Sequence, residues 1–105
     1  MTICEWIWGK YTEYNNTKDE DKRFKYGGII TSEEETFRHF EVFCKNICSG
    51  GYLKDLKQIG FTYEQLEKAK ESKYMKEDMY KGEIAYLLTN KGIKTIWKCM
   101  NKQTA

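Results

Sequence analysis

The chain has 105 residues, with 40% apolar and 15% aromatic side chains, and its 18 basic and 16 acidic groups leave a formal net charge of +2. This composition is typical of a folded globule and excludes a disordered polar tail. The near balance of charge predicts neither a general nucleic-acid binder nor an acidic mimic of nucleic acid.

No run of about 18 apolar residues is present, which argues against a membrane-spanning helix and membrane contact. The first residues lack the basic start and long apolar stretch of a secretory signal. We therefore expect a cytoplasmic, soluble protein that forms a single domain over residues 1–105.

The N-terminal segment has the composition of β-strands. Residues 2–14 are rich in β-branched and aromatic side chains, residues 15–23 are polar and charged, and strand character returns in 24–31. This predicts an N-terminal β-hairpin over residues 1–31. A hairpin alone is marginal in water, so its aromatic side chains should either extend the core, with Trp97 as a contact, or form a subunit interface.

From Ser32 onward the pattern becomes helical. Thr31 with Glu34, or Ser32 with Glu35, forms a capping-box sequence at the start of the first such helix. Apolar residues then recur at helical spacing, namely Phe37, Phe40, Cys44, Ile47 and Cys48. Gly50-Gly51 is expected to stop this helix, and a short second helix should end at Gly60.

A third helix is predicted to begin at Thr62, which forms a capping box with Gln65, and to run to about Tyr74. Its inward side chains are expected to be Tyr63, Leu66 and Ala69, while Met75 should face outward. Residues 75–89 predict two strands around a turn at Tyr80-Lys81-Gly82. A last helix, capped by Thr89, has an apolar stripe of Ile93, Ile96, Trp97 and Met100.

This order of elements resembles the winged helix-turn-helix family, especially its small bacterial and phage members. The resemblance is carried by Leu88-Thr89-Asn90-Lys91-Gly92 after a hairpin, and by residues 59–66 at the turn before the third helix. It covers residues 33–103. It implies a winged helix-turn-helix over residues 32–105. Residues 1–31 lie outside the family pattern, and with the β-hairpin that their composition predicts, the expected fold class is α+β.

The resemblance also implies binding to double-stranded DNA, with the third helix in the major groove and the hairpin near the backbone. Gln65, Lys68 and Ser72 would then contact the major groove, and Lys76 and Lys81 the flanking backbone. Dimerisation, which is common in the family, would pair two such helices, so a homodimer is one expected form.

The charges around this helix argue for a second hypothesis. Residues 62–75 contain three lysines and three glutamates, and the hairpin adds acidic groups beside its two lysines. Another basic stripe is predicted on the last helix, at Lys91, Lys94, Lys98 and Lys102. Such a stripe either binds phosphate or an acidic protein surface, or simply keeps an outer helix face hydrated.

We therefore hold two functional hypotheses from the sequence. The first is a small DNA-binding transcriptional regulator of phage or mobile-element type. The alternative is a protein-binding inhibitor or adaptor on the same scaffold, such as a phage anti-defence (anti-CRISPR-like) protein.

Catalytic and metal chemistry find little support in the sequence. Cys44 and Cys48, completed by Cys4, Cys99 or His39, would give a zinc site, but the spacing matches no common zinc module. The first two fall on an apolar stripe, so we predict buried thiols. His39 has no recognisable nucleophile or base as partner and is expected to be structural. No cofactor, metal or catalytic residue is predicted.

Overall fold

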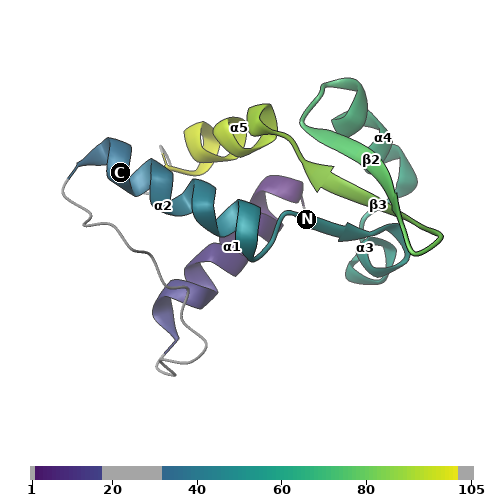
Figure 1. Ribbon diagram of the computed structural model, residues 1–105, viewed down its shortest axis with the longest axis horizontal. Helices are drawn as coiled ribbons and strands as arrows, with labels where there is room; N and C mark the ends of the chain where they lie inside the picture. The colour runs from purple at the N-terminus through teal and green to yellow at the C-terminus, as the bar shows by residue number, and fades with distance from the viewer. Residues whose placement is uncertain (1, 18–31, 102–105) are drawn as a thin grey trace.

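The computed structural model describes residues 2–17 and 32–101. These ranges form five helices and a three-stranded antiparallel sheet (Figure 1), which confirms the predicted α+β class. In chain order the elements are α1 (Ile3–Asn16), α2 (Glu33–Asn46), β1 (Gly50–Tyr52), α3 (Leu53–Ile59), α4 (Tyr63–Glu71), β2 (Met75–Tyr80), β3 (Glu83–Leu88) and α5 (Asn90–Asn101). None of these helices is long and apolar enough to cross a membrane.

The N-terminal segment is a helix, so the β-hairpin predicted for residues 1–31 is wrong where its first strand was placed. Thr2 caps α1: its hydroxyl accepts a hydrogen bond from the Glu5 N–H at 3.1 Å, and the Glu5 carboxylate bonds back to the Thr2 N–H at 3.3 Å. Ile7 and Tyr11, one turn apart, are buried. Burial of this stripe outweighs the strand preference of its residues. The second strand, predicted over 24–31, lies outside the described residues.

Helix α2 begins as predicted, with the Ser32 hydroxyl accepting a hydrogen bond from the Glu35 N–H at 3.3 Å. It ends before Gly50-Gly51, and these glycines start β1, a strand that the sequence did not predict. Gly50 has φ +139°, and a Cβ there would overlap the Tyr86 carbonyl. Glycine is therefore needed for β1 to approach β3 this closely.

The sheet has the order β1-β3-β2. The β2–β3 hairpin pairs Met75 with Leu88 at its base and Tyr80 with Glu83 at its end. Lys81 and Gly82 turn the chain with positive φ values of 51° and 79°. The predicted hairpin and turn are confirmed.

An aromatic core joins the N-terminal helix to the rest of the chain. Figure 1 shows α1, α2 and α5 gathered at one end of the molecule, with α3, α4 and the β2–β3 hairpin at the other. The Trp8 ring lies 5.3 Å from that of Phe40 and 5.9 Å from that of Trp97. This confirms the prediction that N-terminal aromatic side chains extend the core against Trp97, although they do so from a helix.

The Leu88–Gly92 segment ties α5 to the chain that follows α4. The Thr89 N–H donates to the Tyr74 carbonyl at 3.0 Å, and the Thr89 hydroxyl accepts from the Gly92 N–H at 3.1 Å. Thr89 thus caps α5 as predicted. A Cβ at Gly92 would overlap the Tyr74 carbonyl oxygen, so the glycine permits a close approach of two backbones.

Candidate functional site

The start of α4 is fixed by the predicted capping box. The Thr62 hydroxyl accepts from the Gln65 N–H at 3.2 Å, and the side-chain oxygen of Gln65 accepts from the Thr62 N–H at 2.9 Å. Gln65 is exposed, as predicted, but its oxygen is used by the cap. Bidentate contact with an adenine requires that oxygen, so base recognition by Gln65 would cost a capping hydrogen bond.

The outer face of α4 carries the other two residues predicted to reach a major groove, Lys68 and Ser72, and both are exposed. The acidic side chains of Glu64 and Glu71 are exposed on the same helix. Ser72 is the C-cap residue, whose N–H donates to the Lys68 carbonyl at 3.0 Å. This face therefore mixes a single outward lysine with two carboxylates.

Two predicted orientations around α4 are wrong. Tyr63, expected to point inward, is 52% exposed, and Met75, expected to point outward, is 2% exposed. The helix ends at Glu71 rather than near Tyr74, and Lys73 adopts φ 65°. This turn redirects the chain into β2 and carries Met75 into the core.

A hydrogen-bonded network connects α4 to the hairpin. The Tyr86 hydroxyl donates to Glu67 at 2.8 Å and to Glu77 at 3.3 Å. The Lys70 ammonium lies 3.3 Å from the Glu67 carboxylate and 3.5 Å from that of Glu77. No local sequence pattern indicates this network, because its members come from three elements. Its charges are paired internally, so Lys70 is not free to neutralise a phosphate.

The pKa values of this network follow from the same contacts. The hydrogen bond from Tyr86 lowers the pKa of Glu67, to which Lys70 also contributes. Burial raises the pKa of Tyr86, and the hydrogen bond to Glu67 adds to that effect. Near neutral pH, the arrangement therefore holds a protonated phenol against an ionised carboxylate.

The two hairpin lysines predicted to contact a DNA backbone are both exposed. Lys76 is the strand neighbour of Glu77, and adjacent residues of a strand project to opposite faces. Since Glu77 contacts Lys70 of α4, Lys76 lies on the hairpin face away from that helix. Lys81 lies in the turn. The structure therefore does not bring Lys68 and Lys76 together on one positive face.

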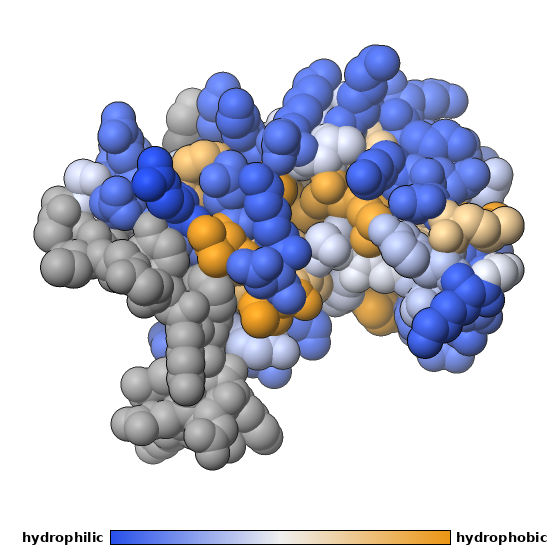
Figure 2. Space-filling model, viewed as in Figure 1, coloured by the Kyte–Doolittle hydropathy of each residue, from blue (hydrophilic) through white to orange (hydrophobic). Residues whose placement is uncertain are grey.

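Apolar side chains occupy the face of the hairpin that is directed toward α4. Met79 and Ile84 are paired across β2 and β3 and are 62% and 36% exposed. They lie on the same face as Glu77 and Tyr86. Tyr63 approaches from α4, where the charge of Glu67 raises its pKa. We call Tyr63, Met79 and Ile84 the hairpin patch. Figure 2 shows apolar atoms among hydrophilic ones at this end of the molecule.

The region from Thr62 to Glu83 has no positive excess. It contains five lysines and six acidic residues. Binding to the DNA backbone is usually dominated by neutralisation of phosphates by basic side chains. The face built by α4 and the hairpin therefore lacks the charge that a DNA-binding surface normally supplies.

The described lysines of the secondary basic stripe on α5 are exposed, and one of them also makes contacts within the chain. The Lys91 ammonium donates to the Ser72 carbonyl at 3.1 Å and lies 5.3 Å from the centre of the Tyr74 ring. Lys91 thus helps to hold the Leu88–Gly92 segment, of which it is part, against the chain that follows α4. Lys94 and Lys98 are exposed, and Lys102 lies outside the described residues.

The thiols and the imidazole do not assemble a reactive centre in residues 2–17 and 32–101, where no three His, Cys, Asp or Glu side chains converge as metal ligands. Cys44 is fully buried, and burial raises the pKa of its thiol from 9.0 to about 12. Cys48 is half-buried. His39 is buried with its Nδ1 bonded to the Tyr11 hydroxyl at 2.7 Å. These positions suit structural side chains.

No protein-family model, curated protein or solved structure matches this chain. Its function is therefore inferred from the chemistry of the face formed by α4 and the hairpin.

Proposed function

We propose that the chain is a non-enzymatic binding module built on a winged helix-turn-helix scaffold, and that the face of α4 and the hairpin binds another protein. The order helix, strand, helix, helix, strand, strand, helix from α2 to α5 is compatible with that scaffold, as is the sheet order β1-β3-β2. The added helix α1 supports the core from outside this unit.

The observation that carries the proposal is the hairpin patch beside a charge network in which Lys70 is paired with two carboxylates. Tyrosine, methionine and other large apolar residues are enriched at the centres of protein interfaces, from which charged residues are depleted. Here Tyr63, Met79 and Ile84 are exposed, while Lys70 pairs with Glu67 and Glu77. The surface thus offers an exposed apolar patch next to charges that are paired with one another, while the outer face of α4 keeps its exposed lysine and two carboxylates. An inhibitor or adaptor would use such a face.

DNA is the second candidate ligand, favoured by the exposure of Lys68 and Ser72 on α4 and of Lys81 in the hairpin turn. The two candidates differ in their response to salt. We expect no binding of the full chain to a fluorescent random DNA duplex, measured by anisotropy in low-salt buffer. Binding that weakens steeply as salt rises would instead identify DNA as the ligand and contradict the proposal.

The protein ligand is tested with a pair of matched variants. Replacing both Met79 and Ile84 by serine removes the apolar part of the patch. Ile47→Ser is the control, because Ile47 is 44% exposed and lies outside the patch. We expect affinity capture from host lysate, quantified by mass spectrometry, to recover a stoichiometric partner with the wild type and the control. The double variant should lose it.

Self-association gives a further discriminating measurement. Sedimentation of the purified chain shows whether the patch pairs two copies. A dimer that the double serine variant dissociates would make the chain itself the partner. Equal capture by the double variant and the wild type would contradict a role for the patch.

A further inference from the structure

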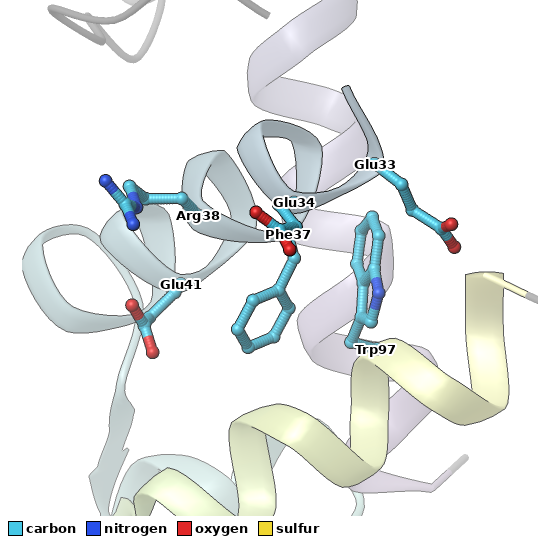
Figure 3. A pocket seen from close by; sticks show the side chains of 6 residues that line it. All are labelled: Glu33, Glu34, Phe37, Arg38, Glu41 and Trp97. Atoms are coloured by element: carbon cyan, nitrogen blue, oxygen red, sulfur yellow. The ribbon is translucent and has the colours of Figure 1, made fainter. Parts of the chain in front are cut away.

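A pocket of about 400 Å³ lies between α2 and α5, on the helical end of the molecule rather than on the face of α4 and the hairpin. Figure 3 shows its lining side chains. They are Glu33, Glu34, Phe37, Arg38 and Glu41 of α2 and Trp97 of α5. Its volume falls within the range of about 300–1,000 Å³ typical of ligand sites. Neither the proposed protein binding by the face of α4 and the hairpin nor DNA binding by that face involves this pocket.

Two aromatic rings form the apolar part of this pocket. Phe37 and Trp97 meet edge to face, with ring centres 5.7 Å apart and an interplanar angle of 63°. Behind them, the Trp97 ring lies 5.9 Å from Trp8 and 5.8 Å from Phe40. Because these core contacts hold Trp97, its exposed surface is available to a ligand without a large loss of side-chain entropy.

The polar lining is predominantly negative, with three carboxylates and one guanidinium. The N-terminus of α2 contributes only about half a positive charge. Among residues 2–17 and 32–101, neither Glu33 nor Glu34 has a basic side chain within ion-pair distance, and Glu41 has only the exposed Lys45, at 3.9 Å. In Figure 3 Arg38 is turned away from the two rings, which lie between Glu41 and Glu33.

We propose that this pocket binds a lysine or arginine side chain from a basic segment of a partner protein. Aromatic faces attract organic cations through their quadrupoles, and the surrounding carboxylates complement the charge. A neutral apolar ligand would desolvate those carboxylates without compensation, and an anion would be repelled. Charge and shape together therefore favour a cation on an aliphatic stem. The site is independent of the proposed hairpin patch.

The test uses the full ¹⁵N-labelled chain and three short peptides in which glycine alternates with arginine, lysine or glutamate. The indole N–H signal of Trp97 reports the pocket, and that of Trp6, whose ring packs against Phe61 rather than Trp97, serves as the internal reference. The arginine and lysine peptides should shift the Trp97 signal in a saturable manner, while the glutamate peptide should not. An unmoved Trp97 signal, or an equal response to the glutamate peptide, would overturn the proposal.

Charge-matched variants distinguish specific binding in the pocket from non-specific electrostatic attraction of the peptide. Replacing Glu33 and Glu34 by glutamine should weaken arginine-peptide binding about 5- to 10-fold, since two exposed ion pairs, each weak, are lost together. Replacing Glu64 and Glu71 on α4 removes the same charge but should change the affinity less than 2-fold. Salt largely screens charges that lie more than roughly 10 Å from the bound peptide. Equal effects of the two double variants would contradict a specific pocket.

A further variant tests how much the aromatic rings contribute to peptide binding. Phe37→Leu keeps an apolar side chain but removes a ring face, and should weaken binding about 2- to 5-fold, with a thermal melt confirming that the variant is folded. A Trp97 signal that shifts on dilution of the chain alone would show that a second copy fills the pocket, and would overturn the proposed occupant.

Discussion

The Tyr11 hydroxyl and the His39 Nδ1 atom are hydrogen bonded at 2.7 Å in the buried contact between α1 and α2. His39 is the chain's single histidine. Burial lowers the pKa of its imidazole below the ordinary value of 6.5. The helix that the sequence did not predict therefore supplies the partner of the residue that the sequence predicted to be structural.

This contact predicts a loss of stability on mild acidification. Below pH 6.5 the unfolded chain takes up a proton on His39, whereas the folded chain resists it because its pKa is lowered. The stabilising contribution is thus fully present above pH 6.5 and is lost as the pH falls from there through the folded pKa. Urea unfolding at pH 7.5, 6.5 and 5.5 should show a falling free energy of unfolding.

A His39→Gln variant provides the control for this titration. It should be less stable than the wild type at pH 7.5, but its stability should vary less between pH 7.5 and 5.5. A wild-type stability that is flat or rises on acidification would show that the folded imidazole is not destabilised in its charged form.

Replacing Gly92 by alanine should have a large effect on the free energy of unfolding. A methyl group at this position would overlap the Tyr74 carbonyl, which also accepts the Thr89 N–H. Gly92→Ala should therefore lower the free energy of unfolding by about 2 kcal/mol, as expected for overpacking against backbone. The measurement is urea unfolding monitored by tryptophan fluorescence.

Gly9 offers the matched control, because it is exposed in α1 and a Cβ there meets no atom within 4 Å. Gly9→Ala should raise stability by about 0.5–1 kcal/mol through helix propensity. If both alanine variants stabilised the chain, the proposed backbone contact at Gly92 would be wrong.

Local signals explain how much of the fold was predictable. Ser32, Thr62 and Thr89 each cap the helix that their side-chain chemistry predicted, and the Tyr80–Gly82 turn lies where expected. Each of these features depends on residues only a few positions apart. The exposure of Gln65 and Lys68 on α4 followed from helical geometry for the same reason, whereas the exposure of Tyr63 did not.

The N-terminal helix shows where such reasoning fails. Ile3, Ile7 and Tyr11 are spaced by four, which fits both an alternating strand and one helical turn per step. The β-branched and aromatic composition favoured a strand, yet Thr2 and Glu5 form a capping box of the kind used correctly at Thr62. In this segment the capping box, and not the composition, indicates the secondary structure that forms.

Other features depend on contacts distant in the sequence. The strand β1 exists because Gly51 pairs with Tyr86, and no local pattern in Gly50–Tyr52 indicates this. The network of Glu67, Lys70, Glu77 and Tyr86 likewise requires α4, β2 and β3 to be placed in space first. The candidate site is therefore recognisable as a partly apolar face without positive excess only in three dimensions.

A substitution of Tyr86 measures how much the network stabilises the packing of the hairpin against α4. Tyr86→Phe removes the hydroxyl that donates to Glu67 and Glu77 and leaves the buried ring in place. We expect a loss of about 1–2 kcal/mol in the free energy of unfolding, because the acceptors are charged but partly solvated. Tyr80→Phe, at an exposed position of the same hairpin, should change stability by less than about 0.5 kcal/mol. Equal effects of the two variants would argue against the network.

The cysteines predict an order of chemical reactivity. Thiolates rather than thiols react with maleimides, and Cys44 is both fully buried and shifted by burial to a pKa of about 12. Cys99 is exposed, whereas Cys4 and Cys48 are half-buried with pKa values that burial raises. At pH 8 in native buffer, Cys99 should be modified first and Cys44 last. Peptide mass spectrometry of a time course measures this order.

Labelling of the unfolded chain is the control for this order of reactivity. In concentrated urea all four cysteines should react at similar rates, since burial no longer separates their pKa values.

In the folded chain the raised pKa of Cys44 contributes stability that is complete below pH 9.0 and is lost as the pH rises from 9.0 through about 12. Cys44→Ala should remove that part of the alkaline sensitivity while creating a small cavity in the core. Native labelling of Cys44 as fast as Cys99 would contradict its burial in the core.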